Sequence, residues 1–508
     1  MKQLTEHFDY IVLGAGSAGC ILAATLAQRL PRCRILLLEA GGDIPPDDQT
    51  VWDPTQWVLV TRDPKLQWGY RSVPQPGLDN RVIDLGRAKA LGGCSTHNAM
   101  VYVRGGGYGF DKWEKEGCQG WGYESVLPYF EWVEERVHVT IAEPDPFFTD
   151  LVVACDNQGI PYNANYNTSP HEFGVAPFQF LISPEGKRET TYSSFVRGKG
   201  HDNLIIATRT RFDRILFDGE KRARGVVVTH LDSGLQEELP VKREVVVAAG
   251  AIGSPQLLML SGVGPPQHLR DLGIPVVSAL PGVGENFQDD LFVTGMFLSR
   301  KPMPQQPYGL MGAVIFTATD PSTLPHLTDV ECSLATGTMA GLALPPPQRQ
   351  SYFIYPNLQL LGSRGTVRLA SERSSDDPIL DPRYLSAPED IWRCIEGVKL
   401  ARRVGRDRGL EAWFSEEVLP GPGVNTDAEI EAYVRKTADT CYHYAGTCKM
   451  GIDDTAVVTP DLKVKGTQGL RVIDASIIPT AVSGNTAAAT MMIAAKGADL
   501  VLADYDKH

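Results

Sequence analysis

The chain has 508 residues, of which 43% are hydrophobic and 21% charged, and its formal net charge at pH 7 is −13. This length predicts two or more domains in an ordinary globular protein. The acidic balance argues against nucleic acid as a partner and, more weakly, against an anionic membrane surface, because both attract clustered Lys and Arg.

The start of the chain and its cysteines favour a reducing location. The first apolar run, 10–13, has the length of a strand and lacks the charged leader and long apolar core of a secretory signal. No stretch approaches the roughly 18 apolar residues of a membrane span. The nine cysteines form no CxxC pair, which fits neither a disulfide framework nor a zinc site. We therefore expect a cytoplasmic protein with no membrane span and no metal.

Residues 9–41 predict a dinucleotide-binding unit. A strand runs into Gly14-Ala-Gly16-Ser-Ala-Gly19, then come a helical stretch and a second strand that ends at Glu39. The three glycines suit a tight turn, a close approach to a pyrophosphate and close helix–strand packing, respectively. The phosphates would lie at the helix N-terminus, and Glu39 would accept hydrogen bonds from a ribose. The place of the motif near the start of the chain, with no second fingerprint, favours FAD over NAD.

Short β-branched runs alternate with helical patterns toward both ends of the chain, which predicts an α/β domain with a largely parallel sheet. Between about 295 and 440 the pattern changes, with proline-rich loops at 301–307 and 344–347. The run 352–369 is typical of strands joined by a turn at 362–365. The middle of the chain is therefore expected to form a second domain inserted into the first.

Four further segments resemble the glucose–methanol–choline (GMC) oxidoreductases. They are GRAKALGGCSTHNAMVYVRG at 86–105, GAIGSPQLLMLSGVG at 250–264, SRGTVRL with DPRYL within 363–385, and the run from HYAGTCKMG to GADL over 443–500. They occur in the order of the family and span nearly the whole chain, whereas about 295–355 matches only loosely. The resemblance implies an FAD-dependent enzyme.

The pattern and the resemblance together predict an α/β fold with two domains. A Rossmann-type FAD-binding domain is expected from 1–150, 195–295 and 440–508. An interleaved substrate-binding domain, built on an antiparallel sheet with flanking helices, is expected from 151–194 and 296–439.

The resemblance also implies which residues hold the cofactor. The glycine-dense segments 86–107 and 250–264 would cover the flavin and its pyrophosphate, the adenine would lie near Phe212, and the turn at Asp474 would meet the ribityl chain or ring. The predicted cofactor residues are Gly14, Gly16, Ser17, Ala18, Gly19, Glu39, Ala40, Gly86, Arg87, Leu91, Gly92, Gly93, Ser95, Thr96, His97, Asn98, Ala99, Met100, Phe212, Ala249, Gly250, Ser254, Asp474, Ala475, Asn485 and Thr486.

His443 and Asn485 are the predicted catalytic pair. Alcohol oxidation by a flavin requires hydride transfer to N5 and loss of the hydroxyl proton, and histidine suits the second step near neutral pH. His443 lies in a sequence similar to the family's HxxGTxxMG, whose histidine takes that proton, and Asn485 stands where the family has His or Asn. An amide can orient the alcohol but cannot act as a base. The alternatives are a satisfied core histidine and an asparagine that only caps the helix beginning at Thr486.

His97 departs from the small aliphatic residue that most members of the family have at this position. In some members a histidine here is bonded to the 8-methyl carbon of the flavin. A neutral imidazole nitrogen can add to that carbon in an electrophilic tautomer of the oxidised flavin. FAD bound covalently through His97 is therefore expected, and the alternative is an unlinked histidine beside the dimethylbenzene ring.

The sequence thus predicts FAD-dependent oxidation of a primary alcohol to an aldehyde, with dioxygen or a quinone or cytochrome as acceptor. A hydroxynitrile-lyase-like enzyme or a photodecarboxylase on the same fold is the alternative. A choline-type substrate would need an anionic or aromatic cage. Asp329, Glu331, Tyr352, Phe353 and Tyr355 could contribute to one, but no spacing identifies it. The alcohol and the oligomeric state stay open.

Overall fold

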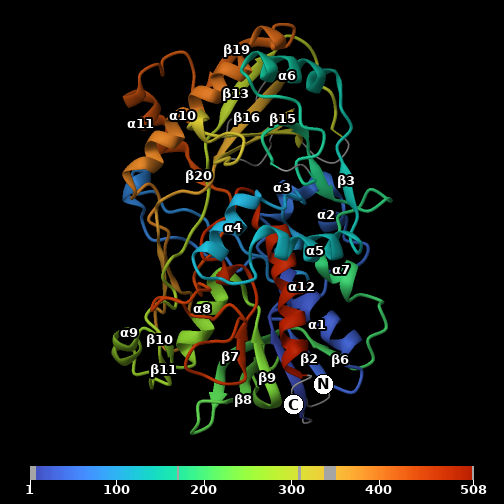
Figure 1. Cartoon of the computed structure of the whole chain (residues 1–508), viewed down its shortest axis with the longest axis vertical. Helices are drawn as coiled ribbons and strands as arrows, with labels where there is room; N and C mark the ends of the chain where they lie inside the picture. The colour runs from blue at the N-terminus through green and yellow to red at the C-terminus, as the bar shows by residue number, and fades with distance from the viewer. Residues whose placement is uncertain (1–6, 169–170, 307–310, 337–349, 506–508) are drawn as a thin grey trace.

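The computed structural model describes residues 7–168, 171–306, 311–336 and 350–505. Its two main sheets lie one above the other along the long axis of the molecule, with several short helices between them (Figure 1). The proline-rich segment predicted at 344–347 lies outside the described residues.

The lower sheet carries the nucleotide fingerprint. Its strand order is β6-β2-β1-β9-β8-β7, and β21 also pairs with β9. The contacts of β1 with β2 and β9, of β2 with β6 and of β21 with β9 are parallel, whereas β7 and β8 form an antiparallel extension. The strands are β1 (Phe8–Leu13), β2 (Ile35–Leu38), β6 (Leu204–Ala207), β7 (Thr210–Phe217), β8 (Ala223–His230), β9 (Gln236–Val247) and β21 (Leu470–Val472). This largely parallel sheet confirms the predicted α/β class.

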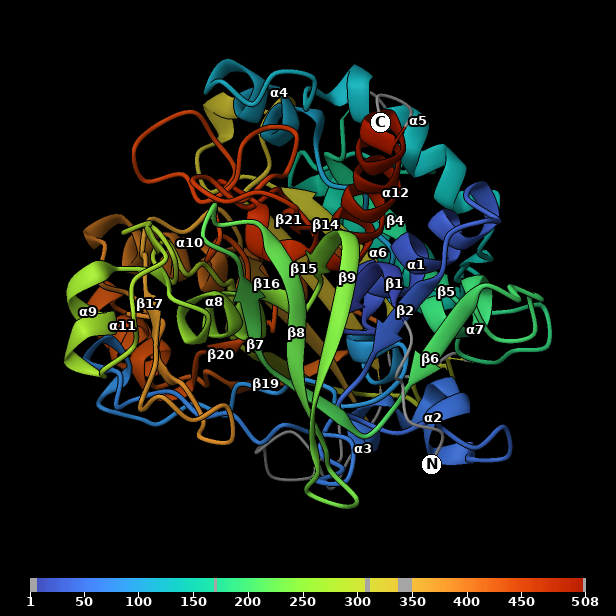
Figure 2. The ribbon, with the colours of Figure 1, turned by 90° about the horizontal axis from the view of Figure 1, so that it is seen from below.

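Helices cover this sheet because its central strands are apolar on both faces, as is typical of parallel strands. All four residues of β2 are fully buried. Helices α1 (Ser17–Arg29) and α12 (Thr486–Tyr505) lie side by side next to β1 (Figure 2). Helix α8 (Gly250–Leu260) follows β9 directly. Both α1 and α8 therefore begin at the carboxyl end of a parallel strand, which is where α/β sheets bind ligands.

The upper sheet is antiparallel, with the order β19-β13-β16-β15-β14-β4, and β12 pairs with both β16 and β20. Helices α6, α10 and α11 lie around it (Figure 1). Its elements are β4 (Gly174–Pro177), β12 (Leu291–Phe292), β13 (Gly295–Ser299), β14 (Met311–Thr317), β15 (Val330–Thr336), β16 (Ser351–Leu358), β19 (Phe414–Leu419), β20 (Asp439–Thr440), α6 (Pro146–Asn157), α10 (Pro388–Gly405) and α11 (Asp427–Thr437).

The remaining elements connect or flank the two sheets. They are α2 (Gln49–Trp52), α3 (Trp57–Val60), α4 (Gly107–Lys115), α5 (Tyr123–Glu134), β3 (Val139–Ile141), β5 (Gln179–Leu181), α7 (Thr191–Phe195), β10 (Val263–Gly264), α9 (Pro266–Asp271), β11 (Ser278–Ala279), β17 (Thr366–Arg368) and β18 (Ile379–Asp381).

The run 352–369 contains two strands, as predicted. They do not form a hairpin, because β17 pairs with β18 and not with β16. The connecting segment leads away because Gln359 donates its N–H to Asp329 and Gly365 pairs with Phe287. These contacts carry the chain out of the upper sheet before it can turn back on β16.

The strands of the two sheets fall largely within the two sets of ranges expected for the domains. Strand β12 at 291–292 belongs to the upper sheet although it precedes the expected boundary at 296. The exact domain boundaries stay a prediction.

Among the described residues, one helix, α12, is long and apolar enough to cross a membrane, judged by length and composition alone. Its mean hydropathy is 1.3. In the fold, 61% of that window is buried inside the molecule, and α12 packs against α1 and α5. Its apolar character is therefore accounted for by contacts within the protein.

Gly19 is expected to be intolerant of substitution. A Cβ at this position would lie 1.8 Å from the carbonyl oxygen of Gly14, and the atom that it meets belongs to the backbone rather than to the end of a flexible side chain. Overpacking of this kind costs about 1–3 kcal/mol. Gly19→Ala should therefore lower the free energy of unfolding by at least this amount in denaturant titrations. Gly219→Ala, whose methyl group would meet nothing within 4 Å, is the control, and equal stability of the two variants would contradict the packing argument.

Candidate active site

A cavity of about 560 Å³ lies between the two sheets, at the carboxyl ends of β1 and β9. Most of the predicted cofactor residues line it, together with His443 and Asn485. The lining members are Gly14, Gly16, Ser17, Ala18, Glu39, Ala40, Gly86, Arg87, Gly93, His97, Asn98, Ala99, Phe212, Ala249, Gly250, Asp474, Ala475, Asn485 and Thr486.

The other predicted cofactor residues do not line the cavity but support its wall. Gly19 packs against Gly14, as described above, and Ser254 donates its hydroxyl to Asp474 at 2.5 Å. Ser95 donates to the carbonyl oxygen of Gly92. The residues of this second group are Gly19, Leu91, Gly92, Ser95, Thr96, Met100 and Ser254. Sequence motifs do not separate the residues that line the cavity from those that support its wall, because both kinds are needed to hold the backbone in the same conformation.

The fingerprint end of the cavity suits a dinucleotide. Gly16 caps the start of α1 and has no side chain that could bond to the first turn, so the N–H groups at this helix end remain available to a pyrophosphate. Gly93 approaches Gly16 from the opposite side so closely that a Cβ on Gly93 would lie 2.6 Å from the Gly16 Cα. Two bare backbone segments therefore face each other where the phosphates of FAD would lie.

Glu39 is fixed at the end of β2, as predicted. Its carboxylate accepts the N–H groups of Ala15 at 3.0 Å and Gly41 at 2.8 Å. Burial raises the pKa of Glu39 to about 7, although these two hydrogen bonds oppose the shift. The carboxyl group remains on the cavity wall beside Ala40, where a ribose would reach it.

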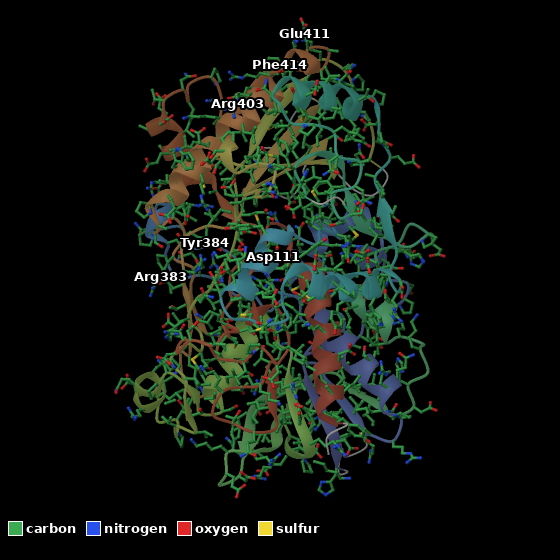
Figure 3. The ribbon with its side chains drawn as sticks, in the orientation of Figure 1. Asp111, Arg383, Tyr384, Arg403, Glu411 and Phe414 are labelled. Atoms are coloured by element: carbon green, nitrogen blue, oxygen red, sulfur yellow. The ribbon has the colours of Figure 1, made fainter. Side chains whose placement is uncertain are left out.

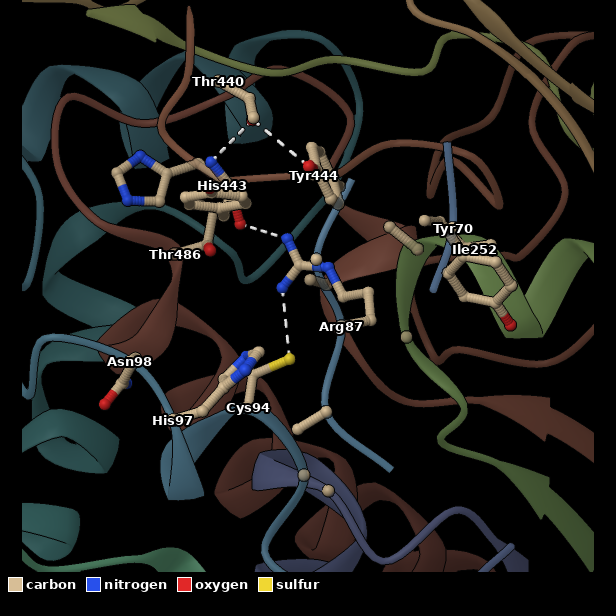
Figure 4. Close-up of a pocket in the computed structure, with 18 of the residues that line it drawn as sticks. Tyr70, Arg87, Cys94, His97, Asn98, Ile252, Thr440, His443, Tyr444 and Thr486 are labelled. Atoms are coloured by element: carbon tan, nitrogen blue, oxygen red, sulfur yellow. Dashed lines mark hydrogen bonds between the residues drawn. The ribbon is translucent and has the colours of Figure 1, made fainter. Parts of the chain in front are cut away.

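His443 and Asn485 meet at the opposite part of the cavity. The Nε2 atom of His443 lies 3.0 Å from the Nδ2 atom of Asn485, and the ring of His443 faces into the cavity (Figure 4). The amide can donate to Nε2, and the amide Oδ1 atom is buried without a hydrogen-bond partner. The predicted pair is therefore brought together, with one acceptor left over for a ligand.

Asp290 completes this arrangement and was missed in the sequence. Its Oδ2 atom lies 2.9 Å from Nδ1 of His443, and its side chain is 96% buried. Burial opposes the charged form of His443, but the hydrogen bond and charge of Asp290, followed by the charge of Glu331, raise the pKa of His443 above its ordinary value. The carboxylate thus keeps the proton on Nδ1 and leaves the Nε2 lone pair toward the cavity.

The neighbouring Asp289 holds the backbone of His443. It accepts the N–H of His443 at 2.9 Å, and it also accepts the hydroxyl groups of Thr440 and Tyr384. Tyr384 lies at mid-height in the molecule (Figure 3). No sequence signal links 289–290 to His443, because 153 residues separate Asp290 from the ring that it contacts.

His97 lies in a second polar cluster on the cavity wall. Its Nδ1 atom is 2.6 Å from the Nε2 atom of Gln67. Arg87 donates to the sulfur of Cys94 at 3.2 Å, and Figure 4 shows the ring of His97 beside that sulfur. Gln67 and Cys94 were not predicted as site residues.

Two of the five residues considered for a cation cage line the cavity. Strand register pairs Ser333 with Tyr355 and Glu331 with Asn357, and all four line the cavity. Burial raises the pKa of Glu331 to about 7. The hydroxyl of Tyr355 is buried without a partner.

The other three cage candidates do not reach the cavity. Asp329 accepts hydrogen bonds from Thr319, Tyr352 donates to Gly405, and Phe353 is stacked on Tyr355 in the core. Strand alternation explains the separation of Tyr352 from Tyr355, because the two lie on opposite faces of β16.

Comparisons with known proteins agree with this geometry. Two models of the GMC oxidoreductase family match 8–292 and 362–494. The chain is 35% identical over 544 residues to the mitochondrial choline dehydrogenase of Mus musculus, covering 98% of this chain and 89% of the relative. It is also 35% identical over 546 residues to the oxygen-dependent choline dehydrogenase of Pseudomonas aeruginosa, covering 98% and 95%.

A solved structure extends the likeness to the whole fold. The pyridoxine 4-oxidase from Mesorbium loti superposes with a TM-score of 0.90 and 29% sequence identity, covering 99% of this chain and all of the other. The segment between the two family matches includes β13, β14, β15 and β16, where the sequence resemblance was also weakest. The chain belongs to the GMC oxidoreductase family, and it is an FAD-dependent oxidoreductase that acts on CH–OH groups.

Proposed function

We propose that this enzyme oxidises a primary alcohol to an aldehyde, with His443 as the general base and Asn485 as its partner. The observation that carries this proposal is the position of the His443 ring, held between Asp290 and Asn485 at the cavity wall. FAD, held by the cavity residues named above, would supply the acceptor for the hydride that leaves the carbinol carbon. Dioxygen, a quinone or a cytochrome then takes the electrons.

His443 would remove the hydroxyl proton through Nε2. With its proton kept on Nδ1 by Asp290, the neutral ring can present its Nε2 lone pair to an alcohol that takes the place of the Asn485 amide there. The imidazolium that forms is then paired with the Asp290 carboxylate, which stabilises the charge where it develops. Asp290 is a positioning residue in this step, because it acts through the ring.

Asn485 would orient the alcohol oxygen. Its amide Nδ2 atom lies beside Nε2 of His443, and its Oδ1 atom has no partner within the described residues. An amide can donate to an oxygen that gains alkoxide character and can accept from a hydroxyl. Because it cannot take the proton near pH 7, the base role falls to His443 alone.

The test is an anaerobic panel of alcohols read by the visible absorbance of the flavin. Oxidation predicts that an alcohol substrate bleaches the flavin without oxygen and yields one aldehyde per flavin. A lyase would turn over its substrate without bleaching the flavin, and a photodecarboxylase would turn over only in light; either result would overturn the proposal. Oxygen uptake by the active alcohols would then distinguish an oxidase from a dehydrogenase.

We also propose that FAD is attached covalently to His97. Support comes from the place of His97 on the cavity wall and from the fixed orientation of its ring against Gln67. In a denaturing gel under ultraviolet light, flavin fluorescence is expected to stay with the wild-type protein band. It should leave the band in His97→Asn, which still binds FAD reversibly. Fluorescence that runs ahead of the wild-type band would contradict the linkage.

We propose a cytoplasmic location as well. All nine cysteines are unpaired in the fold, as expected for a protein that folds in a reducing compartment. Fractionation of the source cells is the test, and recovery with the extracellular or periplasmic fraction would contradict it.

A further inference from the structure

The backbone of the active site bends at Tyr442, the residue directly before His443. Tyr442 adopts a φ of +63°, in the left-handed region that residues with bulky side chains rarely occupy. Tyr442 is also 41% exposed, so burial of its side chain does not account for this conformation. A residue in such a region persists where its surroundings determine its backbone. The contacts that hold this bend therefore also position the His443 ring.

One peptide group joins Tyr442 to His443, and it is held at both of its ends. Arg87 donates to its carbonyl oxygen, and Asp289 accepts its N–H at 2.9 Å. Because a peptide group is planar, a cation at the oxygen and a carboxylate at the N–H fix the orientation of that plane. The Cα atom of His443 lies in the same plane, so the point from which the imidazole side chain leaves the backbone is fixed with it.

Arg87 also contacts the other neighbour of His443. Its guanidinium carbon lies 4.0 Å from the ring centroid of Tyr444, a distance at which a cation is attracted to an aromatic ring. Its Nη1 atom donates to the sulfur of Cys94 at 3.2 Å. Figure 4 shows Arg87 between Cys94 and the segment that carries His443 and Tyr444. A single side chain from 86–105 thus contacts both residues that flank His443.

We propose that Arg87 is a positioning residue for the general base, because it holds both neighbours of His443. The ring is thereby kept where Asp290 and Asn485 contact it. This inference rests on the role proposed above for His443. Since a guanidinium group stays protonated near neutral pH, Arg87 cannot take the proton of the alcohol and acts through the ring.

The alternative is a role of Arg87 confined to the cofactor, because Arg87 lines the cavity and belongs to the segment expected to cover the flavin. In that case, loss of the cation would slow flavin reduction whether or not His443 is present. If Arg87 acts through His443, its removal has no further effect once the imidazole is gone. A double-mutant cycle separates these two cases, since residues that act as a unit are not additive.

The experiment compares the wild type, Arg87→Met, His443→Ala and the double variant as full-length holoenzymes. Stopped-flow absorbance gives the rate constant of flavin reduction at saturation with the alcohol that bleaches the flavin fastest in the anaerobic panel. A misplacement of about 1 Å costs roughly 10²-fold, so Arg87→Met should reduce its flavin about that much more slowly. The half-saturating alcohol concentration should stay near the wild-type value, and the double variant should match His443→Ala.

A second readout needs no alcohol. Burial lowers the pKa of His443, but the hydrogen bond and charge of Asp290 raise it above its ordinary value. The charges of Glu331 and Asp289 act in the same direction. If the ring loses its alignment with Asp290 in Arg87→Met, the pKa of His443 should fall. NMR of the holoenzyme with isotope-labelled histidine follows this titration, and the His443 signal is identified by its absence in His443→Ala.

Arg136→Met is the matched control. The guanidinium carbon of Arg136 also lies 4.0 Å from an aromatic ring centroid, that of Trp132. Arg136 also donates to a backbone carbonyl oxygen, but it does not line the cavity. This variant should keep the wild-type rate of flavin reduction and the wild-type pKa of His443.

Thermal unfolding and FAD content are measured for every variant. If Arg87→Met does not retain FAD, Arg87→Lys takes its place. Lysine keeps the charge but has one nitrogen where arginine uses two, toward Tyr442 and Cys94, so slower reduction is again expected. A role of the charge alone would instead leave Arg87→Lys at the wild-type rate.

A wild-type rate together with a wild-type pKa of His443 in the Arg87 variants would overturn the proposal. So would a double variant that falls below His443→Ala by the same factor that separates Arg87→Met from the wild type. A wild-type rate in His443→Ala is a different outcome, because it would overturn the base itself, and with it the premise of this role for Arg87.

Discussion

Replacing His443 by alanine should lower the rate constant for flavin reduction by a saturating alcohol by about 10²–10⁴-fold, the usual contribution of a positioned general base. The ring has a carboxylate on one nitrogen, and its other nitrogen is an acceptor in contact with the Asn485 amide at the cavity wall. Asn485 cannot replace it, because an amide does not accept a proton near pH 7. Anaerobic stopped-flow absorbance measures this step without any contribution from the electron acceptor.

The control is His138→Ala. His138 also pairs with a carboxylate, that of Glu189, but its side chain is 58% exposed and does not line the cavity. In the His138→Ala variant, the alcohol should reduce the flavin at the wild-type rate. The bound flavin content and visible spectrum of His443→Ala should match those of the wild type. Reduction of this variant within threefold of the wild-type rate would rule out His443 as the base.

The cofactor half of the site could be predicted because its chemistry is local. The turn from Gly14 to Gly19 and the acid at Glu39 lie within one strand–helix–strand unit, where backbone geometry dictates the residue types. The structure places both ends of this unit on the cavity wall. The pairing of His443 with Asn485 followed from the family resemblance, and the structure brings their side chains to 3.0 Å.

The residues that support the rings of His443 and His97 could not be predicted, because these contacts join segments that are distant in the sequence. Asp290 and His443 are joined through the pairing of β12 with β20, and an acid in a loop gives no signal of such a partner. Gln67 reaches His97 across 30 residues. Nothing in the local pattern distinguishes either residue from an ordinary polar side chain.

The cage candidates could not be told apart from the sequence for a different reason. Periodicity gives the two faces of a strand but does not tell which face meets the cavity. The register of β15 with β16 settles this, since it places Glu331 and Tyr355 on the cavity side. The fold class, in contrast, needed only the alternation of strands and helices and was confirmed.

Asp290→Asn should lower kcat/KM by about 10- to 150-fold, which corresponds to the loss of a hydrogen bond to a charged group worth roughly 1.5–3 kcal/mol. The pH profile should change as well. The base must be neutral, so kcat/KM rises as pH increases through the pKa of His443. Asp290 favours the imidazolium and raises that pKa. Without its charge, the acidic limb of the profile should move to lower pH while the plateau falls.

The two changes together separate a positioning carboxylate from one that only supports the fold. A folding defect would lower the amount of active enzyme at every pH and leave the limb in place. Asp439→Asn is the matched control, because Asp439 also lines the cavity with a carboxylate but makes no hydrogen bond to the ring of His443. It should leave the plateau near the wild-type value. An unshifted limb in Asp290→Asn would show that the carboxylate does not set the basicity of His443, and His443 would then owe its proton affinity to Glu331 and Asp289.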